Sequence, residues 1–244
     1  MLKPSRFLLG PLFALLLTHG ISFASAQEAT PGWNSGSRNA DGSLKVALTF
    51  GGGYDTSAGA TRKYQGVGWN YRMGAGYRLN RRFAALVEYG FDHFGIPQSQ
   101  APYIYRNFLN PPTSVDGNIH LWSVTLEPTF NYFQTEHYGG YLVGGGGFYR
   151  KLTSINLPAN QCVLFTGFPT CFPVTAAMTH TSNNAGGANL GAGFGWRVWD
   201  HSNTKLFLEA RYVWIDGQSS PNNTLYPPAN YHTGYYPITG GVRW

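Results

Sequence analysis

The sequence is poor in charge. Only 11% of its 244 residues are Asp, Glu, Lys or Arg, against about 25% in a typical soluble domain. The formal net charge is +6, but the basic residues are scattered along the chain, whereas nucleic-acid binding needs them clustered on one face. We therefore expect no nucleic-acid partner.

Long hydrophobic runs are missing from the chain after residue 26. No stretch reaches the roughly 18 apolar residues that a transmembrane helix needs. Yet 16% of the residues are aromatic and 32 are glycine. Few charges, many aromatics and no long apolar run are typical of a transmembrane β-barrel, whose lipid face is built from every second residue.

The one apolar run lies at the N-terminus. It covers 7–17, follows Lys3 and Arg6, and precedes the small residues 24–26. This pattern predicts a secretory signal peptide over 1–26, too short to span a bilayer. The polar segment 27–42 shows no periodicity and is expected to be a flexible periplasmic tail, which leaves 43–244 as one domain.

Cysteine is nearly absent. Cys162 and Cys171 are the only two, and a signal peptide implies an oxidising compartment, so we predict a disulfide between them. Two cysteines without a histidine at ligand spacing make a poor metal site. The glycine run 144–147 is not followed by Gly-Lys-Ser/Thr, so it is no phosphate loop. We expect neither a metal nor a cofactor.

Eight segments alternate apolar and polar residues with a period of two, which is the pattern of strands with two different faces. In the clearest of them, Trp69, Tyr71 and Met73 share one face, while Arg72 lies on the other. The expected strands are 43–54, 67–78, 83–93, 118–132, 138–152, 185–199, 205–215 and 235–244.

The connections between these strands alternate in length. Those after the second, fourth and sixth strands are short, and the others are long. The longest, 153–184, could also extend the fifth and sixth strands or add a hairpin of its own. Outer-membrane barrels have short periplasmic turns and long external loops. An even number of strands then places both ends of the barrel domain in the periplasm.

The inward faces carry charges that are predicted to form a network filling the lumen, since eight strands leave room for little more than side chains. A hairpin centred on Asn80 sets Arg72 opposite Glu88, and one centred on Asn203 sets Arg197 opposite Glu209. An open channel, and thus a small porin, is the alternative. The expected network comprises Lys45, Arg72, Glu88, Glu127, Arg197, Glu209, Arg211 and Arg243.

The last strand carries an apolar face formed by Tyr236, Ile238, Val242 and Trp244. It resembles the terminal strand of bacterial outer-membrane barrels, where the final aromatic is part of what the assembly machinery recognises. We expect it to pair with the first strand around Val46–Phe50 and so close the barrel.

Strand number, loop asymmetry, inward charges and this last strand together resemble the small outer-membrane β-barrel family that includes the OmpA transmembrane domain and OmpX. The resemblance covers 43–244. It implies an all-β, eight-stranded antiparallel up-and-down barrel in the bacterial outer membrane, surrounded by lipid and lipopolysaccharide.

Two classes of function remain open. The first is a non-enzymatic surface protein whose external loops, including the aromatic-rich segments 103–112 and 226–231, contact extracellular partners. The second is a lipid A-modifying enzyme, because His180 and Ser182 resemble the His-x-Ser-Asn motif of the barrel deacylases, in which the histidine activates the serine. The next acid in the sequence is Asp200, at the opposite membrane edge.

Overall fold

The computed structural model describes residues 38–40, 42–100, 116–165, 168–198, 204–218 and 231–244. The chain divides into two compact units, Met1–Arg38 and Asn39–Trp244. Only Arg38 of the first unit is described, so the fold below is that of the second. The expected signal peptide and the loop segments 103–112 and 226–230 lie outside the described residues.

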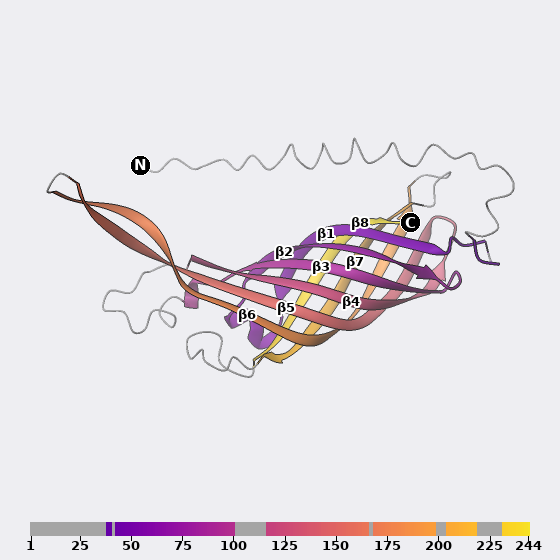
Figure 1. Ribbon diagram of the computed structural model, residues 1–244. Helices are drawn as coiled ribbons and strands as arrows, with labels where there is room; N and C mark the ends of the chain where they lie inside the picture. Colours follow the sequence, from indigo (N-terminus) through magenta and orange to yellow (C-terminus); the bar gives the residue numbers. More distant parts are fainter. Residues whose placement is uncertain (1–37, 41, 101–115, 166–167, 199–203, 219–230) are drawn as a thin grey trace. The chain divides into compact units, whose positions relative to one another are not determined.

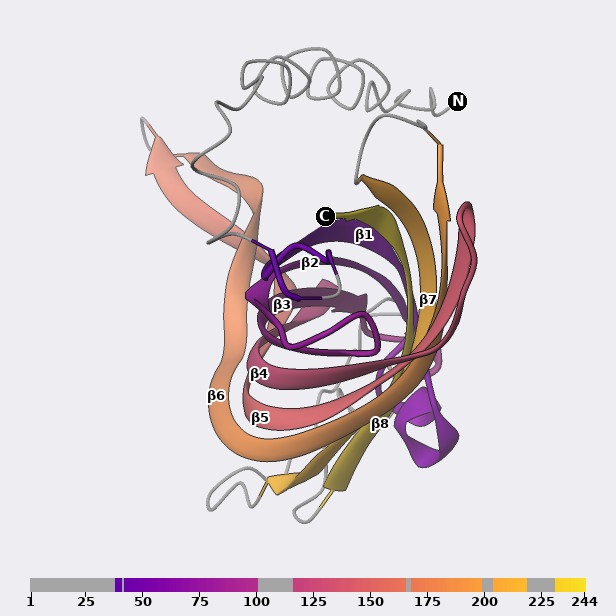
Figure 2. The same ribbon diagram turned by 90° about the vertical axis from the view of Figure 1, so that its right-hand side faces the viewer.

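Eight antiparallel strands form a closed barrel in which each strand pairs with the next and the last pairs with the first (Figure 1). Figure 2 shows the strands curving round into a ring. The expected fold class is therefore confirmed. The strands are β1 (Val46–Ser57), β2 (Val67–Arg78), β3 (Phe83–Gly95), β4 (Asp116–Gln134), β5 (Tyr138–Phe165), β6 (Phe168–Arg197), β7 (Lys205–Gln218) and β8 (Tyr231–Arg243).

Two short 3₁₀ segments lie between the strands, η2 (Gly59–Lys63) and η3 (Gln98–Gln100). Among the described residues no helix has the length and apolarity needed to cross a membrane.

Side chains alternate between an apolar exterior and a polar interior. In β2, Trp69 and Met73 are exposed, whereas Asn70 and Arg72 are buried. This is the reverse of a water-soluble protein, which rarely exposes apolar patches larger than a few hundred Å². Large exposed apolar side chains come from all eight strands, among them Val46, Leu48, Phe50, Val67, Met73, Tyr77, Val87, Val124, Leu126, Leu142, Phe148, Leu190, Phe194, Leu208, Tyr212 and Ile238.

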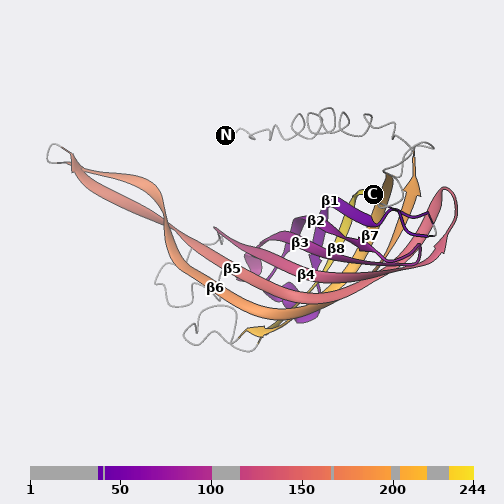
Figure 3. The same ribbon diagram turned by 45° about the vertical axis from the view of Figure 1, so that its right-hand side comes forward.

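Strands β5 and β6 are much longer than expected. The segment 153–184 was expected to be a long connection, with an extension of the two strands left open, and most of it does continue them as a hairpin that extends beyond the other strands (Figures 1 and 3). A register shift between Ile155 and Asn156 marks a bulge near the point where the hairpin leaves the barrel. The segment contains prolines, which are tolerated on edge strands, and beyond the barrel both strands are edges.

Both hairpin registers predicted from the charges are wrong. Arg72 pairs with Gly90, not with Glu88, because the side chain of Asn80 accepts hydrogen bonds from the backbone N–H groups of Arg82 and Phe83 and so shifts the turn. Arg197 pairs with Lys205, not with Glu209. Charge pairing alone therefore does not set the register; the turn does.

The terminal strand closes the barrel as expected. Its pairing runs from Thr49 opposite Arg243 to Ser57 opposite Tyr235, a little further along β1 than predicted. Leu48 and Trp244 add a reciprocal pair of backbone hydrogen bonds, of 2.9 and 3.3 Å. No edge remains between β1 and β8.

Deleting Val242–Trp244 should prevent the barrel from closing. The deletion removes the last β1–β8 pairs, and backbone groups left unpaired in lipid cost several kcal/mol each. The measurement is heat-modifiability on gels: unheated wild-type protein should migrate as a compact species, and the truncated chain should not. Trp244→Phe, which keeps the backbone, serves as the control. A truncated protein that still migrates as a compact barrel would contradict the prediction.

Candidate functional site

The barrel lumen contains a buried ionic network centred on Arg211 of β7. Its two terminal nitrogens, Nη1 and Nη2, each lie 2.8 Å from one carboxylate oxygen of Glu88 on β3. Its Nε pairs with Oε1 of Glu209, and Nη1 lies 3.5 Å from Oε1 of Glu127 on β4. Three carboxylates therefore surround one guanidinium, and the two-point contact with Glu88 is the strong, directional kind of ion pair.

A second arginine extends the network towards the long-loop end. Arg72 Nη1 lies 3.3 Å from Glu88 Oε1, and Nη2 lies 2.8 Å from Oδ1 of Asp92. The hydroxyl of Tyr235 donates to the other oxygen of Asp92 at 2.9 Å. Glu88 is thus shared by both arginines, and it ties β2, β3 and β7 together through the interior.

Neutral side chains complete the network. Asn70 donates to Asp55 Oδ1 at 2.7 Å and accepts from the hydroxyl of Thr239 at 3.0 Å. Asn189 of β6 donates to Glu127 at 2.6 Å. The Asn189 bond adds β6 to the ionic network through Glu127, and the Asn70 bonds link β1, β2 and β8 within the lumen. Buried ions persist only when they are paired and hydrogen-bonded, so the network fixes the strands relative to one another.

Glycines give the large lumenal side chains room. A Cβ at Gly191 would lie 2.6 Å from Cγ of Arg211, and one at Gly145 would lie 2.8 Å from Oε2 of Glu127. Gly145, within the glycine run 144–147, therefore makes space in the lumen, which is a common role of glycine within strands.

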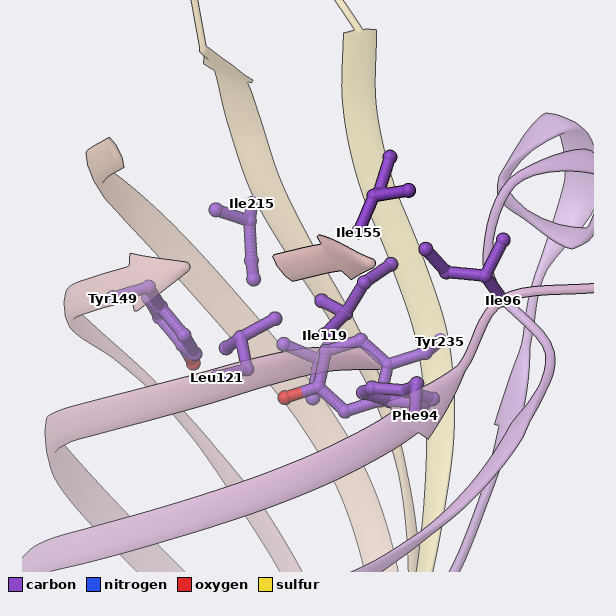
Figure 4. Close-up of a cluster of buried hydrophobic side chains, with 9 residues drawn as sticks. Phe94, Ile96, Ile119, Leu121, Tyr149, Ile155, Ile215 and Tyr235 are labelled. Carbon is purple, nitrogen blue, oxygen red and sulfur yellow. The ribbon is translucent and has the colours of Figure 1, made fainter. Parts of the chain in front are cut away.

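An apolar layer lies next to the ionic network on the long-loop side. Its members come from β3, β4, β5, β7 and β8 and point towards one another (Figure 4). Tyr64, which follows η2, packs against this layer, and the hydroxyl of Thr61 accepts a hydrogen bond from Gly234 N at 2.9 Å. The layer comprises Phe94, Ile96, Ile119, Leu121, Tyr149, Ile155, Val213, Ile215 and Tyr235.

The remaining residues of the expected network lie at the short-turn end of the lumen. Arg243 Nη2 is 3.7 Å from Glu209 Oε2, and its guanidinium carbon lies 4.1 Å from the ring centre of Tyr141. Lys45 and Arg197 face the lumen without an ion pair to any described residue. The structure therefore separates these two from the central network.

Sequence reasoning missed Asp55, Asp92 and Lys151, which are also buried in the lumen. Lys151 Nζ lies 3.2 Å from the hydroxyl of Thr233. The signal was present for Asp92, because it follows Glu88 by four residues and so shares its face of β3.

The candidate catalytic pair does not assemble. His180 Nδ1 lies 3.0 Å from the hydroxyl of Ser154 across the hairpin, while the hydroxyl of Ser182 accepts a hydrogen bond from Arg150 Nε at 3.1 Å. In the part of the chain that the structure describes, no carboxylate is paired with His180. A hydrolase needs the histidine to contact the nucleophile and a third group to orient it, so this geometry does not favour the esterase.

Within the described ranges, no group of three or more His, Cys, Asp or Glu side chains is arranged to hold a metal ion. Cys162 and Cys171 are direct partners in the β5–β6 register.

Comparisons with known proteins give structural similarity alone. No family model matches the chain, and the search of curated proteins found no match to its sequence. The chain resembles neisserial surface protein A at 15% identity, over 82% of this chain and 96% of that one, with a TM-score of 0.45. For Ail of Yersinia pestis, solved with the heparin analogue sucrose octasulfate, the identity is 14%, the coverage 82% and 100%, and the TM-score 0.43.

The N-terminal β-barrel domain of Pseudomonas aeruginosa OprF is also similar, at 15% identity over 81% of this chain and 93% of that one, with a TM-score of 0.36. Similarity of this kind does not identify a function, which has to come from this chain's own residues.

Replacing Arg211 by Met should destabilise the barrel by about 3–5 kcal/mol, because it leaves Glu88, Glu127 and Glu209 as buried carboxylates without their shared cation. Urea unfolding of the refolded protein in lipid vesicles measures this change. Arg150→Met is the matched control: Arg150 is exposed on the outer face, so its loss should change stability by about 0.5 kcal/mol or less. Equal effects of the two substitutions would contradict the role given to Arg211.

Proposed function

We propose that the protein is a non-enzymatic outer-membrane β-barrel with a plugged lumen, acting at the cell surface through its long external loops. The observation that carries the proposal is the inverted polarity of the barrel. Apolar side chains such as Leu126, Phe148 and Leu190 are exposed on the outside, while Arg72, Glu88 and Arg211 are buried inside. Such a surface is stable in lipid and not in water.

The orientation follows from the connections. Strands β2 and β3, and likewise β4 and β5, are joined by short turns at one end, whereas the β5–β6 hairpin extends from the other. Barrels of this class keep short turns in the periplasm. We therefore assign the hairpin to the exterior and the short turns to the periplasm, with export directed by a signal peptide over 1–26 and a periplasmic tail over 27–42.

Three kinds of partner fit this arrangement: outer-membrane lipid and lipopolysaccharide around the apolar belt, the assembly machinery at the terminal strand, and an extracellular partner at the loops. The expected assembly signal, Tyr236, Ile238, Val242 and Trp244, lies on the outward face of β8 and its end, where a recognition factor can reach it. The β5–β6 hairpin is the element best suited to an external contact, because it extends beyond the pairing of the other strands.

A disulfide between Cys162 and Cys171 belongs to the same proposal. Directly opposed residues of an antiparallel pair have Cα atoms about 4.5–5.5 Å apart, which lies within the range that a disulfide spans. In the part of the chain that the structure describes, no cysteine is free. The bond would join the two strands of the hairpin near its tip.

Surface labelling tests the location and the orientation together. Asp216→Cys and Glu136→Cys are introduced separately into a Cys162→Ser, Cys171→Ser background; both positions are exposed, at opposite ends of the barrel. A membrane-impermeant maleimide should label Asp216→Cys in intact cells. It should label Glu136→Cys only after the outer membrane is permeabilised.

The wild-type protein is the control for the disulfide, since it should take up maleimide only after reduction. Labelling of Glu136→Cys in intact cells, or of neither variant, would refute the proposed topology.

A plugged lumen predicts that the purified protein gives no stable conductance. The ionic network and the apolar layer both fill the interior, and an eight-stranded barrel leaves room for little besides side chains. Single-channel recordings in planar bilayers measure this, with the compact band on an unheated gel showing that the sample is folded. Stable, reproducible open levels from folded protein would favour the small porin instead.

A further inference from the structure

Three basic residues form a row across neighbouring strands at the short-turn end of the lumen. Arg197 of β6 is the direct register partner of Lys205 on β7, and Lys205 is the direct partner of Arg243 on β8. All three residues occupy positions on the inward face of their strands. Like charges directly opposite one another in a sheet are destabilising, so this arrangement calls for a compensating negative charge.

Two further cations lie at the same end. The positive charges of Arg78, Arg197 and Arg243 all act on Lys205, and the backbone N–H of Arg78 donates to the carbonyl oxygen of Lys45 at 2.6 Å. The mouth of the lumen therefore gathers basic side chains from β2, β6, β7 and β8, together with Lys45 just before β1.

Arg78 donates a hydrogen bond to an oxygen of Trp244 at 3.2 Å, whereas little negative charge offsets the row of Arg197, Lys205 and Arg243. Glu209 is the one described carboxylate paired with the row, at 3.7 Å from Arg243, and Arg211 already holds its other oxygen. Arg197 and Lys205 make no ion pair with any described residue. The Nε atoms of Arg197 and Arg243 are buried and lack a hydrogen-bond partner. Of the acidic residues in the short turns, Glu136 is exposed and Asp200 lies outside the described residues.

We propose that this row, Arg197, Lys205 and Arg243, is a binding site for an anion of the phosphate class at the inner mouth of the lumen. A phosphate group has several acceptor oxygens, and the forked guanidinium of arginine matches it in two-point contacts, while lysine contributes a point charge. One such anion bridges neighbouring cations that otherwise repel one another.

The direction in which the row faces favours a soluble phosphate over a lipid headgroup. The residues next to the row in sequence, Trp196, Leu206 and Val242, occupy the outward face of the same strands, and Arg197, Lys205 and Arg243 occupy the lumenal one. A soluble anion entering the mouth reaches the row directly. The site depends on the strand register and the lumen, so it stands independently of the surface role proposed above.

Inorganic phosphate is the first probe. The full-length barrel, refolded in a detergent with an uncharged sugar headgroup, is titrated at constant chloride while the arginine Nε–H signals are followed by NMR. Arg197 and Arg243 should show a saturable shift with phosphate in the millimolar range. Arg197→Lys and Arg243→Lys assign the two signals.

The variants make the test specific. Lys205→Gln should weaken phosphate binding about tenfold, or about 1.4 kcal/mol, because it removes one charged hydrogen-bond donor from the site. Arg82→Gln is the matched control, because it removes a positive charge from an exposed position in the β2–β3 turn at the same end of the barrel. Its affinity should match the wild type. If Lys205→Gln fails to give a compact unheated band, Arg197→Gln takes its place.

A second experiment distinguishes a lipid headgroup from a soluble phosphate as the source of the bound anion. The barrel is placed in nanodiscs with and without phosphatidylglycerol, in buffer free of phosphate. Shifts of the two Nε–H signals that require the anionic lipid would support the site and assign its ligand to a headgroup. Absence of a saturable shift in both experiments, or an equal loss of affinity in Arg82→Gln and Lys205→Gln, would overturn the proposal.

Discussion

The two-point ion pair between Arg211 and Glu88 is the contact on which the rest of the barrel depends. It spans the lumen from β7 to β3, strands that are not neighbours in the sheet, and each of the two residues holds further charged partners. Without water to solvate them, these charges have to meet within the protein. The outer face makes no comparable demand, because one apolar side chain packs against lipid much as another does. Interior electrostatics therefore specify the relative positions of the strands, and the exterior specifies only that they lie in lipid.

Much of the fold was predictable because a strand's side-chain period is an exact constraint. Alternation along 67–78 gave the bounds of β2 as the structure has them, and it placed Arg72 inside and Trp69 outside. Register was not predictable in the same way, because it depends on the turn. One side chain, Asn80, shifts the β2–β3 turn and moves Arg72 from Glu88 to Gly90 as its direct partner. The ion pair survives this shift because an arginine side chain is long enough to reach its partner diagonally.

The sequence predicted most residues of the lumenal ionic network, but not which of them pair with one another. The alternation of side chains along each strand identifies which charged residues face inward, but it does not say which of them meet across the lumen. Arg211 contacts carboxylates from β3, β4 and β7, and only β7 is its own strand. Such contacts depend on the tilt and stagger of the whole barrel. The sequence left the length of the β5–β6 hairpin open for a related reason: prolines disfavour a strand inside a sheet, but not on two strands whose outer edges are free.

Charge is distributed unevenly along the lumen, and this bears on the basic row. The buried middle holds five carboxyl side chains, Asp55, Glu88, Asp92, Glu127 and Glu209, beside three basic ones, Arg72, Lys151 and Arg211, so acidic groups outnumber basic groups there. The mouth has the opposite excess. The acidic groups of the middle and the basic groups of the mouth could offset each other only through short contacts, because solvent at the mouth screens charges over longer distances. Among the described residues one such contact is present, between Arg243 and Glu209; it is 3.7 Å long and leaves Arg197 and Lys205 outside it. The acidic interior therefore stabilises one end of the row and leaves the rest of it able to bind an anion from outside the barrel.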